Sequence, residues 1–270
     1  MINNIIFLGT AGDSIIYGKQ YRGSGGIIIK TPNTQLHLDP GPGSLVRAAQ
    51  MKINIRETTG ILVSNTTILK SNDLNALING MTYSGLDHKG VIIADKKVIE
   101  GDEENPPLIN RECLSFVEKA IGLEVGKKAA INDIEVHAVK TFGTESVGFK
   151  IITPNYVIGY TSDTEYRAEL AEEFKDINIF IVNCKNPEGV KEKGTLNTLD
   201  VIKLVEKIKP DLTILTGFGI KMLEHDPINE ARKIQKTTSH QTMAAKDGLI
   251  INPNSYSAFN KQSRLKSYIN

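Results

Sequence analysis

Short runs of β-branched residues that end in glycine-rich turns are the feature that most constrains this chain. Residues 5–8 form an apolar run that is closed by a turn at residues 9–12. Residues 27–30 and 35–38 flank a four-residue turn, which predicts a hairpin. Residues 39–43, Asp-Pro-Gly-Pro-Gly, then interrupt the chain. A start of this kind is typical of a fold built on sheets.

The remainder of the chain alternates predicted helices with predicted strands. We expect a helix over residues 44–51 with Ser44 as its cap. A buried strand at 60–64 leads into the polar segment 65–71, and α/β folds place chemistry in such a loop. The other expected elements are helices at 72–80, 200–209 and 227–236, a hairpin at 91–99, an acidic loop at 100–107, and strands at 131–139, 148–153, 156–160, 177–183, 212–216 and 248–251.

Length and charge limit the class of protein. The 270 residues predict a single α/β domain over residues 1–256, followed by a polar tail at 257–270. The net charge of +1, from 32 basic and 31 acidic residues, weighs against a nucleic-acid partner. No apolar run reaches the roughly 18 residues of a membrane span. The isolated Cys113 and Cys184 favour a reduced, cytoplasmic protein.

Several segments, in consistent order, carry a resemblance to a known superfamily. They are residues 7–12, 38–44, 62–74, 144–149, 160–164 and 215–219. In this order the chain resembles the metallo-β-lactamase-fold superfamily, in its intracellular hydrolase-like branch. The resemblance implies an αββα sandwich, in which two mixed sheets pack face to face with helices outside.

The metal-binding motif that the resemblance implies is degenerate in this sequence. The family carries His-x-His-x-Asp-His after its buried strand, two further histidines, and a catalytic histidine in its nuclease-like members. The corresponding positions here are Asn65, Thr67, Leu69, Lys70, Thr141, Gly217 and Thr195. The bridging aspartate remains, as Asp163. A catalytic zinc ion needs three protein ligands and an open position, so we expect no metal, no cofactor and no catalytic residue at this site.

Other catalytic arrangements have little support in the sequence. The five histidines are not paired at ligand spacing, and His37 is interpreted as a structural side chain on a strand face. The glycine-rich turns at 9–12 and 23–26 match neither a dinucleotide nor a P-loop fingerprint. No serine lies in a nucleophile elbow.

The sequence therefore suggests a pseudoenzyme with a binding, scaffolding or regulatory role. Its partner would be a small molecule or a protein, and homo-oligomer formation stays open. The alternative is a hydrolase with a non-canonical metal site or metal-free chemistry in the same pocket. We expect Asp39 to stabilise its turn, so that Asp39→Ala costs roughly 1–3 kcal/mol. We also expect Lys70 to replace the metal as the positive partner of Asp163.

Overall fold

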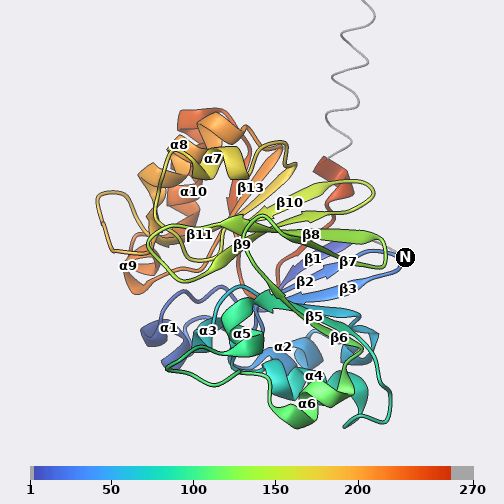
Figure 1. The fold of residues 1–270 in the computed structure, drawn as a ribbon. Helices are drawn as coiled ribbons and strands as arrows, with labels where there is room; N and C mark the ends of the chain where they lie inside the picture. Colours follow the sequence, from blue (N-terminus) through green and yellow to red (C-terminus); the bar gives the residue numbers. More distant parts are fainter. Residues whose placement is uncertain (1–2, 257–270) are drawn as a thin grey trace, which may run out of the picture.

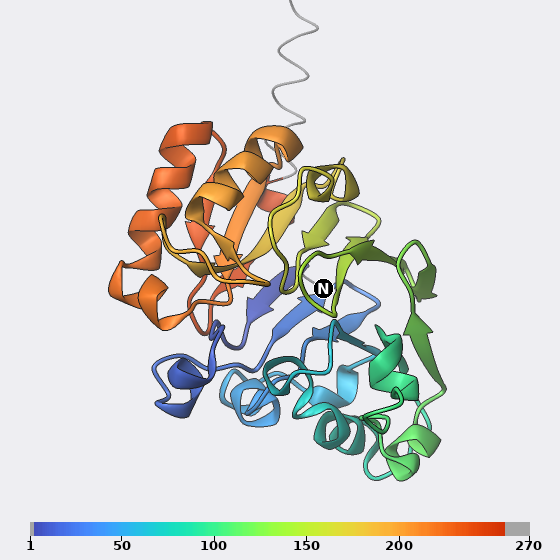
Figure 2. The same cartoon turned by 60° about the vertical axis from the view of Figure 1, so that its left-hand side comes forward.

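The computed structural model describes residues 3–256, and the tail predicted at 257–270 lies outside the described residues. Two mixed sheets pack face to face, with helices on both outer surfaces (Figures 1 and 2). This αββα arrangement confirms the fold class predicted from the sequence. Within the described part, no helix is long and apolar enough to cross a membrane.

The first sheet has the strand order β15-β1-β2-β3-β4-β5-β6. Its members are β15 (Ile250–Ile251), β1 (Asn4–Phe7), β2 (Ile27–Lys30), β3 (Gln35–Leu38), β4 (Gly60–Val63), β5 (Val91–Asp95) and β6 (Lys119–Leu123). The predicted hairpin is confirmed, because β2 and β3 pair antiparallel with Ile27 opposite Leu38. From β3 to β6 the strands are parallel.

The second sheet has the order β14-β13-β11-β10-β9-β8-β7, with β12 beside β11. Its members are β7 (Lys128–Ile131), β8 (Ile134–Lys140), β9 (Val147–Ile152), β10 (Val157–Tyr160), β11 (Ile179–Asn186), β12 (Leu196–Asn197), β13 (Leu212–Thr216) and β14 (Thr242–Ala244). From β7 to β10 the strands pair antiparallel, and from β10 to β14 they are parallel. The carboxyl ends of β10 and β13 therefore reach the same edge of the sheet.

Helices cover the outer faces of the two sheets. They are α1 (Ser14–Gly18), α2 (Ser44–Gln50), the 3-10 helix η1 (Ile55–Glu57), α3 (Ile68–Ser71), α4 (Leu74–Thr82), α5 (Lys96–Glu100), α6 (Arg111–Phe116), α7 (Leu170–Glu173), α8 (Thr198–Ile208), α9 (Ile220–Glu224) and α10 (Pro227–Thr238). In α8, the apolar stripe at Val201, Leu204 and Val205 is buried, and a capping box joins Asn197 to Asp200. The stripe expected over 200–209 therefore does face the core.

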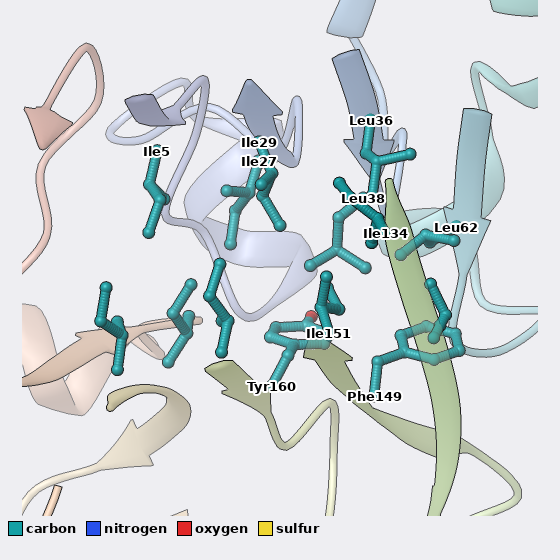
Figure 3. Packing of buried hydrophobic residues seen from close by; sticks show 14 of the residues in the cluster. Ile5, Ile27, Ile29, Leu36, Leu38, Leu62, Ile134, Phe149, Ile151 and Tyr160 are labelled. Carbon is teal, nitrogen blue, oxygen red and sulfur yellow. The ribbon is translucent and has the colours of Figure 1, made fainter. Parts of the chain in front are cut away.

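The main hydrophobic core lies between the sheets and contains side chains from both. In Figure 3, Leu38 of the first sheet lies on one side of this core, and Ile151 and Tyr160 of the second sheet lie on the other. Three further clusters fill the spaces between the sheets and their helices. Burial of apolar area on this scale supplies the main favourable term in folding.

Three local predictions were wrong. Residues 91–99 are not a hairpin, because β5 ends at Asp95, whose side chain accepts from the Lys97 N–H and caps α5. Ser44 does not cap α2; Gly43 does, with φ 85°, and the Ser44 hydroxyl donates to backbone carbonyls instead. The helix expected at 72–80 is present as α4, but the segment 65–71 is not wholly a loop, because Ile68–Ser71 form the short helix α3.

Candidate functional site

A cluster of polar side chains lies at one end of the sandwich, where strands of both sheets end. Asp39 follows β3 and Ser64 follows β4, while Tyr160 ends β10. Asn183 lies in β11, and Lys70 projects from α3. Because parallel strands place their carboxyl ends together, residues far apart in the sequence meet at this point.

Asp39 is the buried carboxylate of the cluster and accepts three hydrogen bonds. Its Oδ1 accepts the backbone N–H of Ser64 at 2.7 Å, and its Oδ2 accepts the hydroxyls of Ser64 at 2.8 Å and Tyr160 at 2.6 Å. Burial raises the pKa of Asp39, whereas the nearby Lys70 and these donors oppose that rise. Three donors at such distances favour the ionised carboxylate. The backbone N–H that Asp39 accepts belongs to Ser64 and not to the turn at 39–43, and the stabilisation of that turn by Asp39 stays a prediction.

The turn after Asp39 depends on a close backbone approach. Asp39 itself has a left-handed conformation with φ 51°. A Cβ at Gly41 would come within 2.2 Å of the backbone oxygens of Leu69 and Ser24. Glycine is therefore required there, and the turn brings the chain against the segment that carries Lys70.

The ammonium of Lys70 lies between two carboxylates. Its Nζ donates to the Tyr160 hydroxyl at 2.8 Å and lies 3.6 Å from Asp39 Oδ2 and 3.9 Å from Asp163 Oδ1. The Lys70 side chain is only 11% exposed. Burial lowers the pKa of Lys70, but the charges of Asp163 and Asp39 and the Tyr160 hydrogen bond outweigh it, so that the pKa is raised overall. The predicted Lys70–Asp163 pair is confirmed by this distance.

Asp163 forms the outer side of the cluster and is 39% exposed. Asn183 donates to its Oδ1 at 3.0 Å, and Asn65 donates to its Oδ2 at 3.4 Å. The side-chain Oδ1 of Asn65 in turn accepts from both the backbone N–H and the hydroxyl of Thr67. Two amides and one ammonium therefore fix the orientation of a half-exposed carboxylate.

The other predicted positions lie at varying distances from this cluster. Leu69 and Gly217 line a cavity of about 30 Å³ beside Lys70, together with Asp39 and Tyr160. Thr141 contacts the Ser146 hydroxyl, which donates to the backbone oxygen of Asp163. Thr195 is not brought to the cluster. Its hydroxyl donates to the Glu192 carbonyl, and the residue lines a separate depression with Glu165 and Lys203.

Sequence reasoning missed Tyr160, Asn183 and the Ser162–Ser64 hydroxyl pair, whose Oγ atoms lie 2.7 Å apart. Both serines are fully buried. A lone tyrosine or asparagine at the end of an apolar strand matches no motif. Its polar character at the carboxyl end of a buried strand is the one signal that could have drawn attention to it.

The residues of this cluster do not fit the dinuclear metal centre that the fold family implies. Within residues 3–256, no three His, Cys, Asp or Glu side chains are grouped as a metal ion would require. Asp39 and Asp163 supply two carboxylates, and the Lys70 ammonium stands between them. A dication there would meet a positive charge and one ligand fewer than catalytic zinc needs.

Comparison with known proteins gives one relative by sequence and many by fold. The chain is 31% identical over 252 residues to MJ1374, an uncharacterized protein of Methanocaldococcus jannaschii, covering 91% of this chain and 93% of that protein. No family model matches the chain.

Solved structures share the fold at low sequence identity. YhfI of Bacillus subtilis, a metallo-β-lactamase fold protein, matches with a TM-score of 0.76 at 14% identity, over 93% of this chain and 99% of that one. The short form of human tRNase Z matches with a TM-score of 0.63 at 11% identity, over 92% of this chain and 98% of that one. A metallo hydrolase of Ignicoccus hospitalis matches with a TM-score of 0.65 at 10% identity, over 93% of this chain and 98% of that one.

Proposed function

We propose that this chain, which belongs to one family with MJ1374 and to the metallo-β-lactamase-fold superfamily, is a non-hydrolytic pseudoenzyme with a binding role. The observation that carries the proposal is the position of the Lys70 ammonium, 3.6 Å from Asp39 and 3.9 Å from Asp163. A lysine paired with both carboxylates cancels one of their two negative charges and places a positive charge where a dication would bind. The hydrolytic water of a metallohydrolase has its pKa lowered by such a dication.

Metal-free hydrolysis by the same cluster is the alternative, and the protonation states argue against it. The raised pKa of Lys70 keeps the amine protonated, so it is neither a base nor a nucleophile. Burial and the Asp39 charge raise the pKa of Tyr160, which keeps the phenol neutral. Ser64 and Ser162 are fully buried and bonded to one another, so a substrate could reach neither.

Metal analysis of protein purified without added metal or chelator tests the proposal. We expect well under one equivalent of transition metal, and no change in melting temperature on adding a chelator, because a bound metal contributes to folding free energy. Hydrolysis of a phosphodiester and an ester reporter should stay at background with added zinc or manganese. Stoichiometric zinc, iron or manganese, or a chelator-induced drop of several degrees, would support the hydrolase instead.

We also propose that the protein works in the cytoplasm. Cys113 and Cys184 are both free and buried. Free thiols that form no disulfide agree with a reducing compartment. Detection of the protein in fractions of lysed cells tests this location, and recovery outside the cytoplasmic fraction would contradict it.

A further inference from the structure

Lys70 links the two sheets of the sandwich at the end where the polar cluster lies. Its helix, α3, follows β4 of the first sheet, and its Nζ donates to Tyr160, the last residue of β10 in the second sheet. Tyr160 in turn donates to Asp39, which follows β3 of the first sheet. The Lys70 nitrogen therefore belongs to a group of polar contacts between the two layers, which also includes the Ser162–Ser64 hydroxyl pair, beside the apolar core.

Within residues 3–256, the hydrogen bond and ion pairs of that nitrogen are made to oxygen atoms. They are the Tyr160 hydroxyl, Asp39 Oδ2 and Asp163 Oδ1, which come from three separate segments. Removal of the ammonium would leave two carboxylates facing each other across a polar space. Asp39 is almost completely buried, so its charge would lack a partner at high cost.

The space around the nitrogen also has a route to solvent. Asp163 is 39% exposed and forms the outer side of the cluster, while the cavity of about 30 Å³ lies beside Lys70. Such a cavity holds about one or two water molecules. Truncation of the lysine would add the volume of its stem to this cavity, which creates room for a small ion that enters past Asp163.

From this arrangement we infer that Lys70 is a tethered cation, and that the cluster is a latent site for a free alkylammonium ion, which binds when the Lys70 side chain is removed. The inference rests on the proposed function, because it requires that no metal occupies the cluster. Oxygen donors from Asp39, Asp163 and Tyr160 would hold the free ion as they hold Nζ. A primary ammonium is favoured, since its N–H groups can donate to these oxygens as lysine does.

Chemical rescue of Lys70→Ala tests the inference. The substitution deletes Cγ, Cδ, Cε and Nζ, which together correspond to propylammonium. We expect the variant to melt on the order of 10 °C below the wild type, because one partner of a buried pair is lost. Propylammonium should raise that melting temperature in a saturable way. Methylammonium should act more weakly, because it leaves the apolar part of the space unfilled.

Matched controls separate rescue from salt and solvent effects. Sodium and tetramethylammonium chloride at equal ionic strength supply positive charge without N–H donors, and should not rescue Lys70→Ala. In Lys70→Met the stem volume stays filled, so this variant should be destabilised but not rescued. Lys203→Ala removes a half-exposed lysine whose Nζ lies 3.6 Å from Asp200, and it should respond to none of the amines.

Equal effects of propylammonium and tetramethylammonium on Lys70→Ala would overturn the inference, as would wild-type stability in Lys70→Met. If Lys70→Ala is unfolded at 25 °C, recovery of its far-UV circular dichroism with propylammonium is the readout, and failure to recover counts against the latent site. Stoichiometric metal in the wild type would instead refute the proposed function. Failed rescue in a metal-free protein would refute the inference alone.

Discussion

Replacing Asp39 by asparagine removes one buried negative charge while the shape of the side chain is preserved. The Lys70 ammonium, 3.6 Å from Asp39 Oδ2, would then lose its nearer carboxylate. At an effective dielectric constant of about 20, the lost attraction is about 5 kcal/mol before desolvation is subtracted. Breaking a buried pair by removing one partner costs about 3–5 kcal/mol. We expect Asp39→Asn to lower the free energy of unfolding by that amount.

This value exceeds the roughly 1–3 kcal/mol that the sequence predicts for Asp39→Ala. The sequence-based figure counted only hydrogen bonds of the turn, whereas the structure adds a buried charge pair and the Tyr160 hydroxyl. Asp39→Ala should therefore lower the free energy of unfolding at least as much as Asp39→Asn. Alanine has no side-chain oxygen, so it loses all three hydrogen bonds that Asp39 accepts.

Urea denaturation followed by circular dichroism measures the free energy of unfolding of each variant. The double variant Asp39→Asn/Lys70→Met should lose less than the sum of the two single losses, because it leaves neither of these two charges without the other. Glu57→Gln, which breaks the exposed pair of Glu57 with Lys30, is the matched control and should cost under about 1 kcal/mol. A loss below about 1 kcal/mol for Asp39→Asn, or strict additivity in the double variant, would refute the reasoning.

Two further outcomes follow from single buried positions. Burial lowers the pKa of His37 to about 4, so between pH 6.5 and 4 the unfolded chain binds more protons than the folded one, and His37 should remove up to about 3 kcal/mol of stability as the pH falls through this window. Urea unfolding at pH 7 and pH 4.5 measures this, and a pH dependence equal to that of His37→Gln would contradict it. Gly217→Ala should lower stability by roughly 1–3 kcal/mol, because Gly217 has φ 65° and a Cβ there would lie 2.9 Å from Asn183 Cγ. Thermal melting measures it, with Gly189→Ala, also at positive φ but with no atom near its Cβ, as the control; equal losses in both would show that Asn183 plays no part.

Local patterns predicted the elements whose causes are local. The hairpin of β2 and β3 follows from two β-branched runs around a short turn, and α8 follows from its apolar spacing. The alternation at 91–99 failed because it also suits a strand followed by a helical turn, and the Asp95 cap decided between them. Short apolar runs leave that choice to the tertiary structure.

The candidate site was predictable only where a position could be aligned with the family. Lys70 and Asp163 were paired in advance, because the motif placed both beside one former metal. The closer approach of Lys70 to Asp39, and the Tyr160 hydroxyl between them, arise from the meeting of two sheets. No spacing along the chain encodes a contact between residues that lie 90 positions apart.

The position of Lys70 also bears on how this protein matures in a cell. A bound ion stabilises a fold by an amount that grows with the logarithm of its free concentration. A cation carried on the chain is present once per molecule from synthesis onward, so its pairing with Asp39 and Asp163 has no such dependence. Under the proposed function, the charge balance at this end of the sandwich is therefore the same in a metal-starved cell and in a metal-replete one. Folding would then need no metal-loading step or metallochaperone, and the protein would not compete with metalloproteins for ions.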